Sequence, residues 1–440
     1  MIELTTQEIA AAVGGVTGVD VPVNGISIDS RSVQPGDLFV ALPGSHVDGA
    51  RFVDAALAAG AVAALVPLHV RADGPVIAVD DPLLALGRVA AEVRRRSPAR
   101  VVAITGSTGK TSTKDILTSL VSPRRRTVAS RENENNELGV PLTLARLEAD
   151  SEVAIVELAM RGLGQIAYLA EIALPNVAVV TSIGPVHLEL LGTVERVAEA
   201  KAEVLHHLAD DATVVVPYGE QLLAPHLEGV QARVVTFGDQ PGADARLVDF
   251  RRLEAGSEAE IALAGRTVVV PVNFNSRHNA LNLTAAVAAY DGIGLPVQEL
   301  GGGSVLVQFS RWRGEELQLP GGGVLIADCY NANPTSMRAA IAHLVEVADL
   351  RRRVAVLGDM AELGEEAPRY HREIGELLRR SGVHLVVGVG PLARWYGGQW
   401  YASRDAVVEA LPDLIRPGDA VLVKASRSMG LEEVVEAIAP

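Results

Sequence analysis

The sequence is poor in cysteine and lacks both a long apolar segment and a leader-like start. Its single cysteine, Cys329, excludes a disulfide within the chain, as is typical of proteins in a reducing compartment. The longest apolar stretch, residues 60–70, is shorter than the ~20 residues that a membrane helix needs. The first ten residues show neither a basic nor an apolar region of a secretory signal. These absences predict a cytoplasmic protein that is not membrane-integral.

Basic residues are outnumbered by acidic ones, and the formal net charge is −15 at pH 7. Nucleic acid is therefore not expected as the main partner, because binding its phosphate backbone needs clustered Lys and Arg. A small anionic ligand remains compatible with this charge, since it needs only a local cationic pocket. At 440 residues, and about 150 residues per domain, the chain should form about three domains.

Three α/β units are predicted, with limits 1–97, 98–310 and 311–440. In the first, residues 25–42 predict two short strands around a Pro-Gly turn, and residues 48–66 predict a helix that leads into a strand. Residues 81–97 predict a helix, because Asp stands at its start and Arg in its last turn.

Short strands that are apolar on both faces dominate the second unit. They are residues 100–106, 152–158, 176–184 and 211–217. Such strands are buried on both faces, as in a parallel sheet covered by helices. Residues 259–272 predict an appended antiparallel hairpin. The third unit repeats the alternation of strands and helices, which favours a doubly wound fold. The expected fold is therefore α/β, with a small α/β N-terminal domain, a central P-loop-type parallel sheet with flanking helices and a Rossmann-like C-terminal domain.

Residues 101–113, VVAITGSTGKTST, resemble a phosphate-binding loop but miss the usual G-x-x-x-x-G-K-[ST] pattern, since Ile104 stands at its first glycine. Gly106 and Gly109 can still let amide groups converge on an anion, and the following helix would point its N-terminus there. Lys110 could reach phosphates, and Thr111 could hold Mg²⁺. A glycine-rich turn with a surface lysine is the alternative. The order strand, loop, helix favours a nucleotide site.

Two polar residues follow other buried strands of this unit. Glu157 and His187 come at strand ends, and the carboxyl ends of parallel strands meet at one ligand-binding edge. Glu157 suits Mg²⁺, which prefers oxygen ligands, whereas histidine is an unusual ligand for this ion. Either side chain could instead make only a local hydrogen bond. Lys201 follows in a predicted helix, and by itself it is typical of a solvated helical lysine.

Asparagines recur in two further segments. Asn279 and Asn282 are three residues apart, so they share one face of a predicted helix, where they could cap the helix or bind a nucleotide. Residues 328–334, DCYNANP, leave a buried strand. They could form a second part of the site, with Tyr330 stacked on a base, or only a strand-to-helix turn.

Long motifs in all three units resemble the Mur ligase family. They are residues 27–52, 105–112, 134–144, 328–337, 358–365 and 424–435. The sequence contains no Asp-Asn-Pro-Arg, a motif typical of the relative that adds diaminopimelate or lysine. The resemblance implies an ATP-dependent amide ligase that joins D-Ala-D-Ala to a UDP-N-acetylmuramoyl-tripeptide through an acyl phosphate, in peptidoglycan precursor synthesis.

The alternatives are a Mur ligase that adds another amino acid, a folylpolyglutamate-synthase-like ligase, and a P-loop switch protein that joins nothing. The resemblance further implies that the first domain binds the UDP-linked substrate, that the second binds ATP, and that the third binds the dipeptide and closes on ATP. We expect two Mg²⁺ ions and a monomer.

The resemblance also assigns roles to single residues. Lys110, His187 and Lys201 would be catalytic, and Lys201 would be carbamylated. The Mg²⁺ ligands would be Thr111, Glu157, His187 and carbamylated Lys201. ATP would bind Gly106, Ser107, Thr108, Gly109, Lys110, Thr111, Ser112, Asn279, Asn282, Arg311, Asp328, Tyr330 and Asn331. The other substrates would bind Ile28, Ser30, Arg31, Ser45, His46, Asn135, Asn136, Lys424, Ser426 and Arg427. Three positions depart from the family pattern. Ser182 replaces a common Asn, and Gln165 replaces an acidic residue. At the third position, either Arg311 or Arg313 could match the family's arginine.

Overall fold

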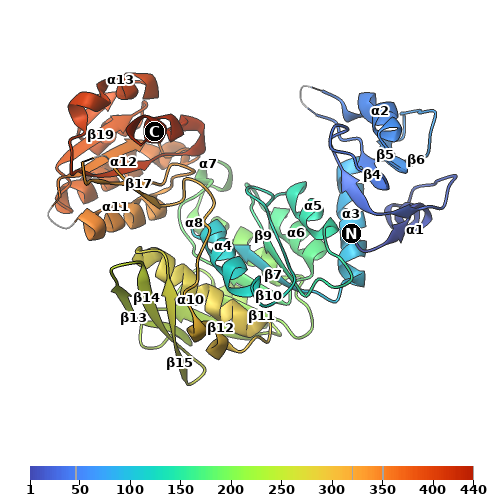
Figure 1. Cartoon of the computed structure of the whole chain (residues 1–440), viewed down its shortest axis with the longest axis horizontal. Coiled ribbons are helices and arrows are strands. Elements are labelled where there is room, and N and C mark those ends of the chain that lie inside the picture. Colours follow the sequence, from blue (N-terminus) through green and yellow to red (C-terminus); the bar gives the residue numbers. More distant parts are fainter. Residues whose placement is uncertain (45–46, 320, 349–350, 440) are drawn as a thin grey trace.

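The computed structural model describes residues 1–44, 47–319, 321–348 and 351–439, which form three larger sheets from three successive parts of the chain and one two-stranded sheet in the first part. In Figure 1 the first part lies at the right, the second in the middle and the third at the upper left. Each sheet falls within one predicted unit, while the unit limits themselves remain predictions. Among the described residues, no helix is long and apolar enough to cross a bilayer.

The first unit is a four-stranded parallel sheet in the order β3-β4-β5-β6. Its strands are β3 (Gly25–Ser27), β4 (Asp37–Val40), β5 (Ala63–Pro67) and β6 (Val76–Val79), and β1 (Leu4–Thr5) pairs separately with β2 (Pro22–Val23). Its helices are α1 (Thr6–Val13), α2 (Val53–Ala58) and α3 (Pro82–Arg96). The two strands around the Pro-Gly turn are confirmed, as is the helix that leads into β5.

Helix α3 joins this unit to the next. It begins at Asp81, whose carboxylate accepts hydrogen bonds from the amides of Leu83 and Leu84, which confirms the predicted helix start. Near its other end the buried guanidinium of Arg94 donates to the carbonyl oxygens of Ala173 and Leu174, at 2.8 and 3.0 Å. The first unit is thus anchored on the carbonyl end of a helix of the second.

The second unit contains a nine-stranded sheet in the order β15-β14-β13-β12-β11-β10-β7-β9-β8. Its strands are β7 (Arg100–Thr105), β8 (Thr127–Ala129), β9 (Val153–Glu157), β10 (Val177–Val180), β11 (Thr213–Pro217), β12 (Arg233–Gly238), β13 (Ala245–Arg252), β14 (Ser257–Leu263) and β15 (Arg266–Val272). Strands β7 to β13 pair in parallel, whereas β14 pairs antiparallel with both β13 and β15. Both the parallel sheet and the appended hairpin are therefore confirmed.

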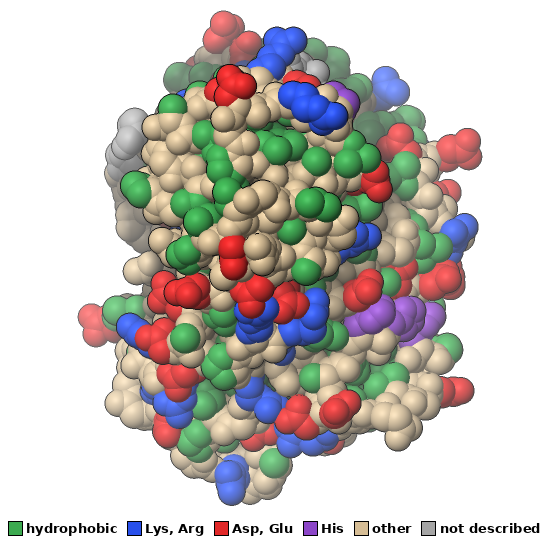
Figure 2. All heavy atoms as spheres, turned by 90° about the vertical axis from the view of Figure 1, so that its right-hand side faces the viewer, with side chains coloured by type: hydrophobic (Ala, Val, Ile, Leu, Met, Phe, Trp, Pro, Cys, Tyr) green, Lys and Arg blue, Asp and Glu red, His purple; other side chains and the backbone are tan. Residues whose placement is uncertain are grey.

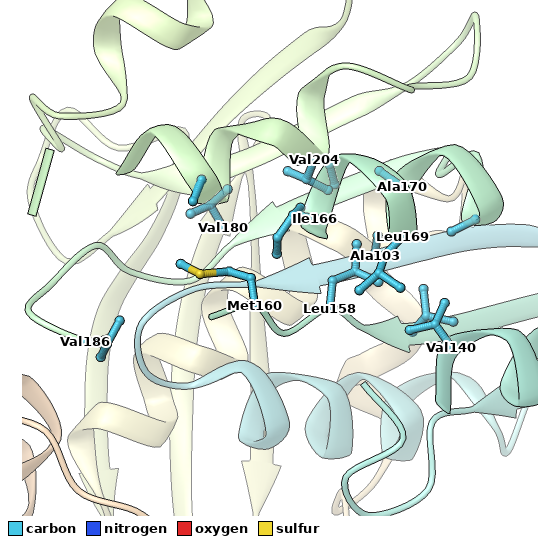
Figure 3. Packing of buried hydrophobic residues seen from close by; sticks show 14 of the residues in the cluster. Ala103, Val140, Leu158, Met160, Ile166, Leu169, Ala170, Val180, Val186 and Val204 are labelled. Carbon is cyan, nitrogen blue, oxygen red and sulfur yellow. The ribbon is translucent and has the colours of Figure 1, made fainter. Parts of the chain in front are cut away.

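Helices cover both faces of this sheet. They are α4 (Lys110–Val121), α5 (Gly139–Ala145), α6 (Gln165–Ala173), α7 (Leu188–Leu191), α8 (Val194–Ala202), α9 (Ala224–Leu227) and α10 (Arg277–Gly292). Val102 and Ile104 of β7 pack in the core with α4 and α10, and Val101 and Ala103 pack on the opposite side with α5 and α6. Figure 3 shows this second layer around Ala103. Burial on both faces explains why β7 reads as an unbroken apolar run.

The third unit has a six-stranded sheet in the order β16-β17-β21-β18-β19-β20, antiparallel only at β16. Its strands are β16 (Glu315–Gln318), β17 (Val324–Ala327), β18 (Arg353–Gly358), β19 (Leu385–Val389), β20 (Gln399–Tyr401) and β21 (Ala420–Lys424). Helices α11 (Pro334–Ala348) and α12 (Ala367–Arg380) pack on one face, and α13 (Arg404–Leu414) and α14 (Glu432–Ile438) on the other. The doubly wound α/β pattern is confirmed.

The surface mixes charges of both signs. Figure 2, which looks at the molecule from the side of the first unit, shows acidic and basic side chains interspersed over this face. On this face, therefore, the acidic side chains do not form one continuous negative patch.

Replacing Arg94 should weaken the attachment of α3. Arg94→Ala leaves two buried carbonyl oxygens without their charged donor, and we expect the free energy of unfolding to fall by about 2–4 kcal/mol. Chemical denaturation followed by circular dichroism measures this loss. The matched control is Arg95→Ala, which removes only a surface ion pair with Glu92 and should change stability by about 0.5 kcal/mol or less. Equal losses in both variants would contradict the anchoring role.

Candidate active site

A cavity of about 840 Å³ lies between the second and third units. It is formed at the carboxyl ends of β7, β9 and β10 in one sheet and of β17 and β21 in the other, where ligands bind in open α/β folds. The predicted phosphate loop is part of its wall, together with the segment after β17. Two motifs more than two hundred residues apart thus meet at one site.

Two glycines give the phosphate loop its shape. Gly106 and Gly109 have φ values of +146° and +81°, which other residues rarely adopt. A Cβ atom on Gly106 would lie 2.0 Å from Thr181 Oγ1, and one on Gly109 would lie 2.5 Å from Asn282 Oδ1. Gly109 also caps the N-terminus of α4. The loop therefore holds glycine where backbone geometry and close neighbours both require it.

The loop is fixed by the segment after β10. Ser182 Oγ accepts a hydrogen bond from the amide of Thr108 at 2.9 Å, and Ser107 Oγ donates to the carbonyl oxygen of Gly184 at 3.0 Å. Ser182, one of the departures from the family pattern, thus binds the loop directly. Its short hydroxyl side chain suits this contact.

Lys110 lies folded across the loop. Its Nζ donates to the carbonyl oxygen of Gly106 at 2.9 Å. Burial lowers the pKa of Lys110, the Glu157 carboxylate acts in the opposite direction, and Arg313 adds to the decrease. Two basic side chains from different units therefore come close enough to repel each other, which makes a local cationic pocket in an acidic protein.

Glu157 lies at the end of β9 with 1% of its surface exposed. Its Oε2 accepts from Thr111 Oγ1 at 2.8 Å, and its Oε1 accepts from Asn135 Nδ2 at 3.0 Å. Carboxylate and hydroxyl oxygens beside a phosphate loop fit Mg²⁺, which takes a few protein oxygens, water and substrate phosphates. In the described ranges, no three His, Cys, Asp or Glu side chains are grouped to hold a metal ion.

Lys201 lies in the last turn of α8 with 2% of its surface exposed, so its interpretation as a solvated lysine is wrong. Burial lowers its pKa well below the usual lysine value, Lys110 lowers it further, and Glu157 opposes the decrease. Within the described residues, no hydrogen bond to its Nζ contributes to this shift. Burial penalises the ammonium form, so this amine is disposed to be neutral.

His187 occupies an unusual backbone position and contacts the third unit. Its φ is +52°, and it precedes α7. Its Nδ1 lies 2.5 Å from Glu362 Oε2, within ion-pair distance although not aligned as a hydrogen bond. His187 lowers the pKa of the Glu362 carboxyl. Glu362 was absent from the predicted site, although its motif, residues 358–365, contributed to the family resemblance.

Sequence models of three Mur ligase segments match the chain. The family's catalytic-domain model matches residues 22–94, the Mur ligase middle domain matches 104–290, and the glutamate ligase domain matches 312–427. UDP-N-acetylmuramoyl-tripeptide–D-alanyl-D-alanine ligase of Synechocystis is 36% identical over 94% of this chain and 92% of its own. The enzyme of the same name from Escherichia coli is 33% identical over 100% of this chain and 99% of its own.

The chain belongs to the Mur ligase family. Solved structures agree with this assignment. MurF from Acinetobacter baumannii superimposes with a TM-score of 0.89 at 30% identity, covering 99% of this chain and 98% of its own. MurF from Thermotoga maritima in complex with ADP gives 0.84 at 29% identity, covering 94% and 97%. A Mycobacterium tuberculosis folylpolyglutamate synthase gives 0.62 at 15% identity, which shows a shared fold alone.

Most residues assigned through the Mur ligase resemblance line the cavity. These are Ser107, Thr108, Gly109, Lys110, Ser112, Asn135, Asn136, Glu157, His187, Asn282, Asp328, Tyr330, Asn331, Lys424 and Arg427. Six others from the second and third units lie outside its lining. These are Gly106, Thr111, Lys201, Asn279, Arg311 and Ser426. Asn279 and Asn282 do share a helix face, since Asn282 Nδ2 donates to Asn279 Oδ1 at 3.0 Å.

Of the two competing arginines, Arg313 lines the cavity. Its guanidinium lies 4.0 Å from the ring centroid of Tyr330, whereas that of Arg311 lies over Trp312, at 4.5 Å. The structure therefore places Arg313, and not Arg311, at this site. This cation–π contact packs the guanidinium of Arg313 against one face of the Tyr330 ring.

Lys424 and Ser426 are engaged within the third unit. Lys424 Nζ, at the buried end of β21, donates to Asp328 Oδ2 at 2.7 Å and to the carbonyl oxygen of Asn331 at 3.0 Å. Ser426 Oγ accepts from the amide of Ala361 at 2.8 Å. These contacts join the segments that follow three strands, so both residues shape the site even where they do not face it.

The substrate residues predicted in the first unit do not line this cavity. Ile28, Ser30 and Arg31 follow β3, and Arg31 forms an exposed ion pair with Asp29 at 2.6 Å. Ser45 and His46 lie outside the described residues.

The sequence reasoning missed one wall of the cavity. It is formed by the ends of β11 and β12, namely Pro217, Tyr218, Phe237, Gly238, Asp239 and Gln240. Strand β12 follows the same rule as the others, because its polar residues come directly after a short apolar run. That signal could have identified Asp239 and Gln240.

His278, at the start of α10, also lines the cavity and was not among the predicted site residues. Burial, with His343 and Lys424 nearby, lowers its pKa to about 3. His278 is therefore neutral at pH 7 and can accept or donate a hydrogen bond without adding charge.

Gly109 offers a sharp test of the loop. In Gly109→Ala the new Cβ would collide with Asn282, so we expect the affinity for a non-hydrolysable ATP analogue to fall at least about tenfold. Isothermal titration calorimetry measures it. Gly229→Ala is the control, because Gly229 has nearly the same φ, +80°, but nothing within 4 Å of its Cβ position. Unchanged binding by Gly109→Ala would refute the loop as the phosphate site.

Proposed function

We propose that this Mur ligase joins D-Ala-D-Ala to UDP-N-acetylmuramoyl-tripeptide at the expense of ATP, in peptidoglycan precursor synthesis. The main support is that the chain is similar over its full length to relatives whose names state this activity. In addition, a phosphate loop and a buried carboxylate lie at one cavity between two domains. We propose residues 1–97 as the UDP-substrate domain, 98–310 as the ATP domain and 311–440 as the dipeptide domain.

The reaction has two steps. An oxygen of the tripeptide's terminal carboxylate attacks the γ-phosphorus of ATP, so that ADP leaves and an acyl phosphate forms. The amine of D-Ala-D-Ala then attacks the acyl carbon, the amine loses a proton, and inorganic phosphate leaves as the amide forms. Both steps gather negative charge, so fixed cations and amide donors should supply much of the catalysis. Lys110 and the loop amides are the groups placed to bind the β- and γ-phosphates.

Thr111 and Glu157 are the residues that would hold one Mg²⁺, because their oxygens already converge beside the loop. His187 and carbamylated Lys201 would serve a second. When bound, these ions would neutralise phosphate charge. Asn135, which donates to the other oxygen of Glu157, would help to orient this carboxylate for the metal.

The surroundings of Lys201 support its proposed carbamylation. A neutral amine, not an ammonium, reacts with CO₂, and the lowered pKa of Lys201 increases the neutral fraction at pH 7. The product is an anion, which two cations would attract, whereas a bare ammonium would be repelled. The buried Nζ of Lys201 thus fits this modification better than it fits a permanent positive charge.

The remaining substrates are placed by analogy with the family. Asn279, Asn282, Asp328, Tyr330 and Asn331 would bind the ATP nucleoside, with Arg313 beside them. Ile28, Ser30, Arg31, Ser45 and His46 would bind the UDP end, and Asn135 with Asn136 the muramoyl-peptide. Lys424, Ser426 and Arg427 would meet the peptides, and Arg427 is the most exposed of the three. We further propose that the protein acts as a monomer in the cytoplasm, where ATP is available.

The defining assay measures phosphate release and peptide product together. Release should require ATP, Mg²⁺, UDP-N-acetylmuramoyl-tripeptide and D-Ala-D-Ala, with one amide formed per phosphate. Phosphate release that ignores either the acceptor or the dipeptide would refute the proposed ligation, and would favour a switch protein instead.

Lys110→Ala should reduce kcat by at least about 10²–10³-fold, because it removes a preorganised cation at the phosphates. Steady-state kinetics with saturating ATP tests this. Arg196→Ala removes an exposed cation of α8 and should leave kcat unchanged. Near-normal turnover of the Lys110 variant would contradict its phosphate role.

Lys201→Ala should lose activity, and short carboxylic acids such as acetate should restore part of it by replacing the carbamate. Wild-type activity should fall when CO₂ and bicarbonate are removed and return when bicarbonate is added, whereas the acetate-rescued variant should not respond. Mass spectrometry of the native protein provides a second readout, a mass increase of one CO₂. Full activity of Lys201→Ala would overturn the carbamate proposal.

A further inference from the structure

The third unit contacts the proposed metal ligand His187 directly. Glu362 Oε2 lies 2.5 Å from His187 Nδ1, and the Glu362 carbonyl oxygen accepts from the amide of Glu189 at 3.2 Å. One residue therefore contacts the segment that begins α7 twice, by an ion-pair contact and by a backbone hydrogen bond. Figure 1 shows α7 at the border between the second and third units.

The backbone on both sides of this contact is constrained. His187 and Glu362 both have left-handed conformations, with φ of +52° and +62°, which are uncommon for residues other than glycine. Such conformations persist where surrounding contacts fix them and are enriched at functional sites. Gly364, in the same segment as Glu362, also packs against α7, since a Cβ atom there would be in van der Waals contact with Glu189 Cα at 3.4 Å.

A histidine that binds a metal through one ring nitrogen usually donates the other N–H to a carboxylate or carbonyl. That second contact fixes the ring and its tautomer. Because Glu362 approaches Nδ1, Nε2 is the nitrogen left to a ligand, and His187 lines the cavity. The geometry is thus that of a metal-binding histidine with its carboxylate partner, except that the partner comes from another domain.

We propose that Glu362 is a positioning residue that orients His187 for Mg²⁺ when the third unit docks. This inference rests on the proposed function, in which His187 is a metal ligand. Docking would then complete the metal site, and the enzyme could not bind its second ion fully before closure. Asn333 of the third unit also contacts the phosphate loop, because its Nδ2 donates to the carbonyl oxygen of Ser107 at 3.3 Å.

Glu362 could instead serve only as a latch between the units. Its second oxygen lies 3.8 Å from Arg161, a partly screened contact that a latch would also use. The two roles differ in what they require of His187. A latch should act without the imidazole, whereas a positioning residue should act only through it.

The experiment measures Mn²⁺ binding to the full chain by electron paramagnetic resonance, in the presence of a non-hydrolysable ATP analogue. For Glu362→Gln we expect the weaker Mn²⁺ site to lose about 10–100-fold in affinity, the usual effect of removing a partner of a metal-binding histidine. The control is Glu365→Gln, an exposed carboxylate in the same segment, which should stay within about twofold of wild type.

A double-mutant cycle separates the two roles. In a His187→Ala background, Glu362→Gln should cause no further loss of Mn²⁺ affinity. In turnover assays, Glu362→Gln should raise the Mg²⁺ concentration for half-maximal rate and leave the KM for D-Ala-D-Ala unchanged.

Unchanged Mn²⁺ affinity in Glu362→Gln, an equal loss in Glu365→Gln, or a full additional loss in the His187→Ala background would each overturn the inference. So would a wild-type protein without a second Mn²⁺ site. Failure of the proposed function would look different. The wild-type protein would then form no amide, although its Mn²⁺ binding would still depend on Glu362.

Discussion

The buried carboxylate of Glu157 is the constraint around which the site is built. Burying a carboxylate is costly unless hydrogen bonds or opposite charges compensate it. Here Thr111 and Lys110 come from the start of the helix after the phosphate loop, Asn135 comes from the loop after β8, and Lys201 of α8 lies close enough for Glu157 to affect its pKa. These neighbours lie on three different segments. The carboxylate therefore fixes how the phosphate loop, the Asn135 loop and α8 meet.

The positions of the lysines in the chain reflect the same constraint. The chain has only four lysines among its 39 basic residues, and all four lie in or around this site. Lys110, Lys201 and Lys424 were described above. Lys114 is buried, pairs with Asp115 at 2.7 Å and donates to the carbonyl oxygen of Ser130. The Ser130 hydroxyl accepts from the amide of Glu157.

At such positions, arginine is not equivalent to lysine. A guanidinium stays charged even when buried, whereas an amine can lose its proton and fits a narrow space as a point charge. A sequence that otherwise favours arginine has thus kept lysine where the chemistry of the site needs a compact or titratable group. Lys201, whose pKa is lowered well below the usual lysine value by burial, is the clearest case.

The sequence could predict the features that depend on neighbours along the chain. Apolar runs predicted the parallel strands, and the pattern around Gly106 predicted the strand, loop and helix, because these are local consequences of burial and backbone geometry. It could not predict that Arg313, rather than Arg311, faces the cavity, since both choices fit one short segment. Nor could it reveal Glu362 or the burial of Lys201. Those depend on how distant segments pack, and the helical pattern around Lys201 alone is that of a surface helix.

Closure of the third unit has an electrostatic cost that an anionic substrate can offset. Docking brings Arg313 close enough to Lys110 to lower the pKa of that lysine, which means that the two cations repel. A polyphosphate placed between them would turn this repulsion into attraction to a common partner. Nucleotide binding should then favour the closed arrangement by mass action, because the anion binds that arrangement more strongly than the open one. The cations that would disfavour an empty closed site are therefore the same groups that would make the proposed closure depend on ATP.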